Sequence, residues 1–68
     1  MERLTNEELE EKIDETGLKR IDFARLAEIS ASYLGAICNG KVKVNEIKAN
    51  TYYRILNTAK QNDGIKNE

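Results

Sequence analysis

The chain of 68 residues has no histidine, no proline, no tryptophan and a single cysteine, Cys38. One cysteine excludes an intramolecular disulfide, and without histidine no residue set has the spacing of a metal cluster. A chain of about this size buries only about 60% of its unfolded surface, and small domains often compensate with such cross-links. We therefore expect a hydrophobic core to stabilise the protein, with no cofactor and no metal. Cys38 is expected to act as a small hydrophobe, since no second thiol exists for a redox switch.

The missing histidine also removes the commonest general base of enzymes. The sequence contains no glycine-rich phosphate loop and no nucleophile-elbow pattern, so catalysis is not expected. No run approaches the roughly 18 apolar residues of a membrane span, and no signal-peptide pattern opens the chain. Together with the single cysteine, which is typical of reducing compartments, these features predict a cytoplasmic protein that is not an enzyme.

The net charge of −1 conceals an uneven distribution of charged side chains. Residues 1–17 carry two basic and seven acidic side chains, whereas residues 18–60 carry eight basic and three acidic ones. The near-zero total therefore does not exclude a polyanionic partner, because the basic part can present one positive face to it. The affinity should then depend on how far the acidic first segment is held from the phosphates.

Four glycines, no proline and 34% charged residues favour an all-α fold. Apolar spacing and capping signals predict a small bundle of four to five helices, with helices over residues 5–16, 20–27, 31–38 and about 47–61. Residues 41–46 alternate too briefly for a strand and are interpreted as a loop, with Val42 or Val44 turned inward. Residues 1–61 are expected to form one domain, and residues 62–68 a C-terminal tail.

Local signals also predict where helices begin and end. Thr5 and Glu8 have the spacing of a capping box, and Gly17 is typical of the left-handed residue that follows a helix. Either Asn45 or Asn50 is expected to cap the last helix. The expected core consists of Leu9, Ile13, Leu18, Phe23, Ala24, Leu26, Ala27, Ile29, Leu34, Ile37, Tyr52, Ile55 and Leu56.

Residues 23–40 carry the most informative pattern. The apolar–alanine pair Phe23-Ala24 precedes a three-residue break that ends in Ser30, a good N-cap. Two apolar residues three apart, Leu34 and Ile37, follow this break, and Asn39-Gly40 then ends the pattern. Two short helices joined by so short a break cross steeply and need a small residue at the crossing, which Ala24 supplies. From residue 18 to about residue 60, the sequence resembles the phage repressor and Cro-type (XRE) DNA-binding family.

This resemblance implies a lambda-repressor-like fold with a helix-turn-helix pair at about residues 20–38. It also implies a transcriptional regulator of a bacterial phage or other mobile element. Helix 31–38 would read the major groove, and a homodimer would bind a two-fold operator. The sequence departs from the family at Glu28, where the turn usually holds glycine. A non-glycine residue at positive φ is uncommon, so the turn is expected to be strained or altered.

The resemblance places a face of small residues against the bases: Ala31, Ser32, Gly35 and Ala36. Only Ser32 has a side-chain hydrogen-bonding group, and none of the four can make a bidentate base contact. Three interpretations are open: close backbone approach to the groove with readout of DNA shape, packing against another protein helix, or a weakly selected surface. Glycine inside a helix destabilises it by about 1 kcal/mol relative to alanine. This cost at Gly35 favours the interpretations in which a partner approaches the helix backbone closely.

Basic and polar residues on both sides of this helix are expected to face phosphates: Lys19, Arg20, Tyr33, Asn39, Lys41 and Lys43. Lys19 and Arg20 lie at a predicted helix start, where backbone N–H groups favour anions. Tyr33 either donates to a phosphate or packs on the following loop. The leading hypothesis is a sequence-specific regulator that binds double-stranded DNA with steep salt dependence. The alternative is a protein-interaction module on the same fold, such as an antirepressor, which uses the small-residue face.

Overall fold

The computed structural model describes residues 3–62, and within this range every regular element is helical. The elements are α1 (Asn6–Glu15), α2 (Arg20–Leu26), α3 (Ala31–Cys38), the short 3₁₀ helix η1 (Val44–Glu46) and α4 (Ala49–Asn62). This arrangement confirms the predicted all-α class. Asn62 is the last residue of α4, and residues 63–68 of the predicted tail lie outside the described part of the chain.

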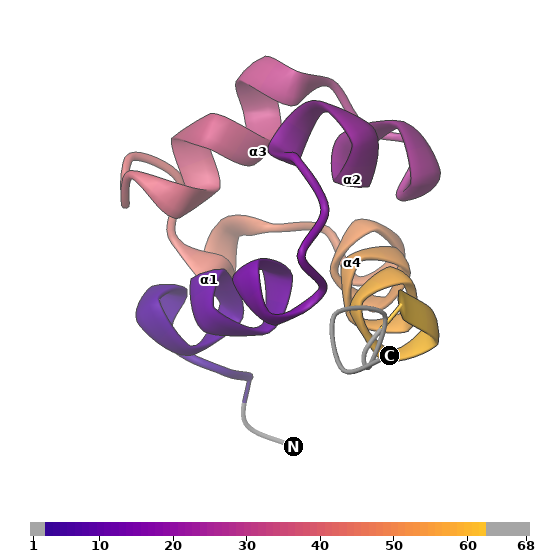
Figure 1. Ribbon diagram of the computed structural model, residues 1–68. Coiled ribbons are helices and arrows are strands. Elements are labelled where there is room, and N and C mark those ends of the chain that lie inside the picture. The colour runs from indigo at the N-terminus through magenta and orange to yellow at the C-terminus, as the bar shows by residue number, and fades with distance from the viewer. Residues whose placement is uncertain (1–2, 63–68) are drawn as a thin grey trace.

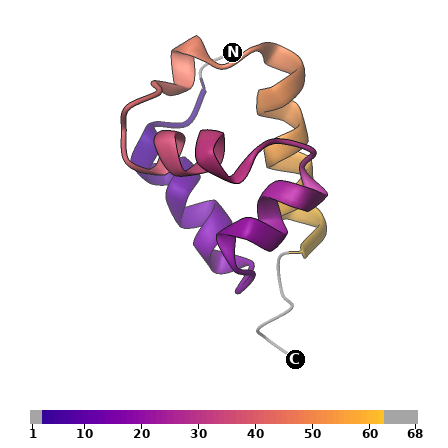
Figure 2. The ribbon, with the colours of Figure 1, turned by 90° about the horizontal axis from the view of Figure 1, so that it is seen from above.

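The four α-helices surround one core. α2 and α3 pack against each other, and α1 packs against both α3 and α4. Figure 1 shows α2 and α3 above α1 and α4, and Figure 2 shows the same pair from above. Because the α2–α3 pair forms one side of the molecule, the outer surface of α3 lies away from α4.

The start of α1 follows the local signals in the sequence. The Thr5 hydroxyl accepts a hydrogen bond from the Glu8 backbone N–H at 3.1 Å, and the Glu8 carboxylate accepts one from the Thr5 N–H at 2.9 Å. These two bonds confirm the capping box. Gly17 follows the helix with a φ of 76°, as expected of the residue after a helix end.

The end of α2 shows why the short break before α3 can form. The Ile29 N–H donates to the Ala24 carbonyl at 2.9 Å, and the Glu28 N–H donates to the Arg25 carbonyl at 3.1 Å. This bond pair is a Schellman motif, which needs a left-handed residue at the position of Glu28. Glu28 has a φ of 62°, so the turn keeps the geometry that glycine would favour. Of the two expected outcomes, a strained or an altered turn, the left-handed conformation of Glu28 corresponds to the strained one.

Three details of the region between α3 and α4 differ from the prediction. The segment 41–46 was expected to be a loop, but it contains η1. The burial of Val44, the first residue of η1, confirms the expectation that Val42 or Val44 turns inward. The last helix begins at Ala49 rather than residue 47, because Ile47 is extended and enters the core. Neither Asn45, inside η1, nor Asn50, the second residue of α4, caps that helix.

The core contains most of the expected residues, with one clear error. Leu26 is 55% exposed, because Phe23 and Ala24 define the buried face of α2. Leu26 follows Ala24 by two residues, about 200° around the helix, and therefore points outward. Buried residues beyond the expected set are Val44, Ile47, Thr16, Thr58 and Ala59, and the expected residues that are only partly buried are Leu18, Ile29 and Leu56.

Candidate nucleic-acid interface

The outer face of α3 is accessible and lacks large side chains. Leu34 and Ile37 are buried on the opposite face of the helix, and the Ser30 hydroxyl caps its start by accepting from the Tyr33 N–H at 3.0 Å. Ala31 and Ser32 are exposed, whereas Gly35 and Ala36 are partly exposed. A methyl group added at Gly35 would meet no atom of the chain within 4 Å. Packing inside the protein therefore does not require glycine at this position.

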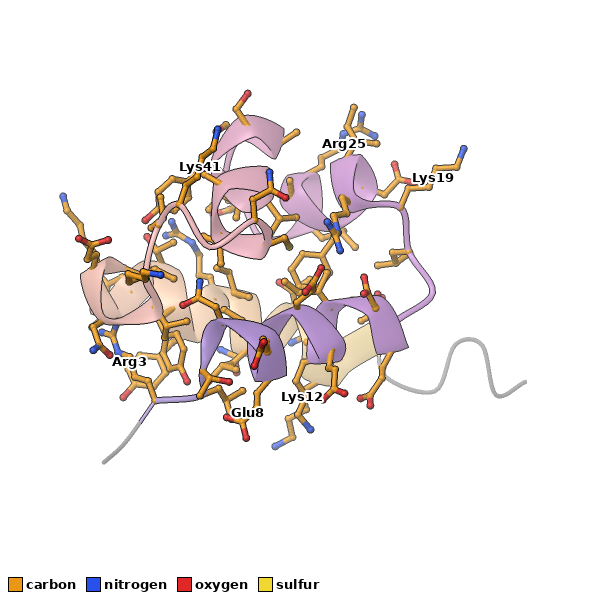
Figure 3. All side chains as sticks on the ribbon, turned by 90° about the vertical axis from the view of Figure 1, so that its left-hand side faces the viewer. Arg3, Glu8, Lys12, Lys19, Arg25 and Lys41 are labelled. Atoms are coloured by element: carbon orange, nitrogen blue, oxygen red, sulfur yellow. The ribbon has the colours of Figure 1, made fainter. Side chains whose placement is uncertain are left out.

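Basic side chains lie on the side of the molecule that α2 and α3 form. Figure 3 shows Lys19, Arg25 and Lys41 extending from one side, whereas Glu8 and Lys12 of α1 extend from the opposite side. We call Lys19, Arg25 and Lys41 the basic face. Glu8 of α1 thus extends away from these three cations, whereas Glu10 and Asp14 of the same helix pair with Arg20 at the start of α2. A polyanion that approaches α3 from this side would not face the Glu8 carboxylate.

Arg20 does not extend freely into solvent, although it follows Lys19 directly. Its Nη2 atom lies 3.0 Å from a Glu10 carboxylate oxygen and 3.2 Å from an Asp14 carboxylate oxygen on α1. Burial lowers the pKa of Arg20, but the hydrogen bond to Asp14 and other contacts outweigh burial and leave the pKa raised. Arg20 therefore connects α2 to α1, and its charge is balanced within the protein.

Arg25 is a basic residue that the sequence interpretation left out of the phosphate-facing set. Its side chain is 77% exposed, and its nearest carboxylate, that of Asp22, lies 3.9 Å away. An ion pair this long and exposed contributes little, so the guanidinium stays available to another anion. The signal in the sequence was an outward-pointing arginine on the helix that precedes α3.

The remaining predicted phosphate contacts lie on and just after α3. Asn39 is the C-cap of the helix and is exposed, and so are Lys41 and Lys43 in the following loop. Tyr33 is partly buried and packs against the core, and its contact with a phosphate stays a prediction. Asn39, Lys41 and Lys43 are therefore all exposed on the segment that leaves α3.

Cys38 lies near this region but has the environment of a packed thiol. It is partly buried against the core, and burial raises its pKa, with the nearby Arg20 charge acting in the opposite direction. A raised pKa disfavours the thiolate, which is the reactive form. Within residues 3–62, no group of three or more His, Cys, Asp or Glu side chains could hold a metal ion. None of the described helices is both long and apolar enough to cross a membrane.

Comparison with known proteins found no relative: no family model, no curated protein and no solved structure matches the chain. The functional interpretation consequently depends on the residues of the α2–α3 side and on their chemistry.

Proposed function

We propose that this protein is a transcriptional regulator that binds double-stranded DNA through α3, with α2 and α3 acting as a helix-turn-helix pair. The observation that carries the proposal is the accessible small-residue face of α3 between exposed basic residues. Lys19 and Arg25 extend from the same side as Lys41, whereas Lys12 extends from the opposite side. This separation supports a single surface for a polyanion.

The residues on this surface suggest how affinity and specificity would be divided. The side chains of Lys41, Lys43 and Arg25 would pair with phosphates, which fix the orientation of a protein on the duplex without reading sequence. The small face of α3 would let the helix backbone enter the major groove closely. Ser32 would supply the one side-chain hydrogen bond to a base edge or phosphate. Sequence preference would then come from thymine methyl contacts and from the shape and deformability of the DNA.

A salt series with matched lysine variants tests the phosphate contacts. Binding to a labelled duplex of mixed sequence is measured by fluorescence anisotropy from low to moderate salt. The Lys41→Ala/Lys43→Ala variant should bind more weakly, and its slope of log K against log salt should fall by about 1.8, or about 0.9 for each lost contact. The control is Lys12→Ala/Lys60→Ala, which makes the same charge change at a groove between α1 and α4. Equal losses in the two variants would contradict a localised interface.

A second experiment tests the reading face. Ala36 is partly exposed on α3, so Ala36→Glu places a carboxylate on that face. If α3 enters the groove, this variant should lose duplex binding while keeping its helical content and melting temperature. Asn57→Glu adds the same charge at an exposed position of α4 and should bind nearly as the parent protein does. Undiminished binding by the Ala36 variant would exclude α3 as the reading helix.

The same face of α3 is compatible with a second candidate function, a protein-interaction module such as an antirepressor. The open space at Gly35 would equally admit a closely packed helix of another protein, because small residues allow two helix backbones to approach. This alternative requires that the parent protein show no binding to duplex DNA even at low salt. The salt series described above therefore decides between the two candidates.

A further inference from the structure

We infer that Asn6 is a positioning residue for the loop that carries Lys41 and Lys43, an inference that rests on the proposed DNA-binding function. Its side-chain nitrogen donates hydrogen bonds to the Ile37 carbonyl at 2.9 Å and to the Val42 carbonyl at 2.8 Å. Its side-chain oxygen accepts one from the Val44 N–H at 3.2 Å. One amide at the start of α1 thus joins the end of α3 to both backbone neighbours of Lys43.

This clamp matters because the loop turns sharply as it leaves α3. Gly40 has a φ of 82°, and the Lys41 and Val42 N–H groups both donate to the Ala36 carbonyl, at 2.9 and 3.2 Å. These bonds hold the beginning of the loop against α3. The carbonyl of Val42 and the N–H of Val44 are instead bonded to Asn6. The side chain of Asn6 therefore sets the path of the backbone on both sides of Lys43.

The chemistry of the clamp requires an amide. Asparagine supplies two N–H donors and an oxygen acceptor in one planar group, and all three are used here. An ionised aspartate has the same shape but only acceptors, so it would direct a carboxylate oxygen at two backbone carbonyls. Replacement by aspartate is therefore a test of the donor bonds that hardly changes the volume of the side chain.

A second side chain holds the far end of the same segment. Arg3 donates through Nη1 to the Val44 and Ile47 carbonyls, both at 2.6 Å, and its guanidinium lies 4.7 Å from the centre of the Tyr52 ring. Arg3 secures η1 and the entry to α4, whereas Asn6 secures the stretch next to the exposed lysines. Asn6 is therefore the residue whose loss should free Lys43 with the least effect on the rest of the fold.

Hydrogen exchange measured by NMR tests the clamp without any DNA. In Asn6→Ala, the Val44 amide loses its acceptor and should exchange several-fold to about tenfold faster, while amides in the centres of α1 and α4 keep their rates. Asn57→Ala makes the same truncation at an exposed position of α4 and should leave the Val44 amide unchanged. An unchanged Val44 rate in Asn6→Ala, or equal acceleration over the whole chain, would overturn the clamp.

A double-mutant cycle tests the positioning role. Asn6→Ala should weaken duplex binding and reduce the salt slope, because Lys43 is no longer held in place. In the Lys41→Ala/Lys43→Ala background, the same substitution should have little further effect. If the losses of duplex affinity from the Asn6 and lysine substitutions add, Asn6 supports only the fold. The same conclusion would follow if Asn6→Ala lowered the fraction of binding-competent protein but left the slope of log K against log salt unchanged. If the alanine variant does not fold, Asn6→Asp takes its place in the cycle.

The Asn6→Asp variant adds a second measurement, the pH dependence of duplex affinity. A residue that acts only by filling space would not affect this dependence. As the pH falls, the new carboxyl is protonated and regains one donor, so its duplex affinity relative to the parent protein should recover. If the ratio of the variant's duplex affinity to that of the parent protein is independent of pH, the hydrogen bonds donated by the Asn6 side chain are contradicted. Failure of the parent protein to bind duplex would overturn the proposed function and the positioning role together, whereas hydrogen exchange decides the clamp by itself.

Discussion

Gly35 combines two properties that make one substitution unusually informative. It lies inside α3, where glycine is less favourable than alanine by about 0.8–1.0 kcal/mol, and a methyl group added there would meet no atom within 4 Å. Gly35→Ala should therefore stabilise the protein by about 1 kcal/mol, since no steric cost opposes the gain. For a domain of this size, that gain corresponds to a rise in melting temperature of about 4–8 °C.

Thermal unfolding followed by circular dichroism measures this shift, and Gly40→Ala is the matched control. The added methyl group at Gly40 also meets nothing within 4 Å, but the φ of 82° is unfavourable for alanine. Gly40→Ala should therefore destabilise the protein by about 1–2 kcal/mol. If Gly35→Ala fails to raise the melting temperature, or if both variants shift it in the same direction, the argument from backbone conformation and open space is refuted.

The same variant separates the uses of the α3 face. If the helix backbone approaches DNA closely, the extra methyl group should weaken duplex binding although the protein is more stable. A surface without a close partner would instead give higher stability and unchanged binding. A Gly35→Ala variant that is more stable but binds duplex DNA more weakly would thus indicate that glycine at this position serves contact with DNA rather than folding.

Three further predictions concern other sites. Glu28→Gly should stabilise the protein by about 0.5–1 kcal/mol in urea unfolding, because relief of the left-handed strain exceeds the added flexibility of the unfolded chain; a lower midpoint would contradict the strain at φ 62°. Leu26→Ser should change stability by less than about 0.5 kcal/mol, whereas Leu34→Ala should cost about 2–5 kcal/mol, since Leu26 is exposed and Leu34 is fully buried; similar losses would be inconsistent with the orientation of α2. Burial raises the folded-state pKa of Cys38 above its unfolded value, so its stabilising effect is complete below the unfolded pKa and is lost as the pH rises through the folded value. Above about pH 8.5, the parent protein should therefore lose more stability than Cys38→Ala does, and parallel pH profiles of the two proteins would refute this effect.

Features that depend on neighbours in the chain were predictable from the sequence. The capping box of Thr5 and Glu8, the left-handed Gly17 and the start of α3 at Ser30 all involve hydrogen bonds over a few residues. For Glu28 the sequence left two outcomes open, a strained or an altered turn, and the φ of 62° in the structure decided between them. The periodicity of the helices likewise predicted most of the core, which is how α3 could be recognised as a helix with one small, outward face.

Features that depend on contacts between distant residues were not predictable. Arg20 looked like a free cation until α1 was folded beside it, and Leu26 looked like a core residue until the orientation of α2 was known. Asn6 lies between the capping residues Thr5 and Glu8, yet the partners of its side chain lie 31 to 38 residues away.

The sequence alone therefore determined the class of fold and the ends of most helices, because these follow from local hydrogen bonding and from the periodicity of apolar side chains. Only the tertiary structure decided which charges are balanced internally and which extend from the α2–α3 side with Lys41. The physical reason is that helix packing brings together groups whose separation along the chain carries no signal. Helix packing thereby decides which charged side chains are paired or buried and which remain exposed to a partner.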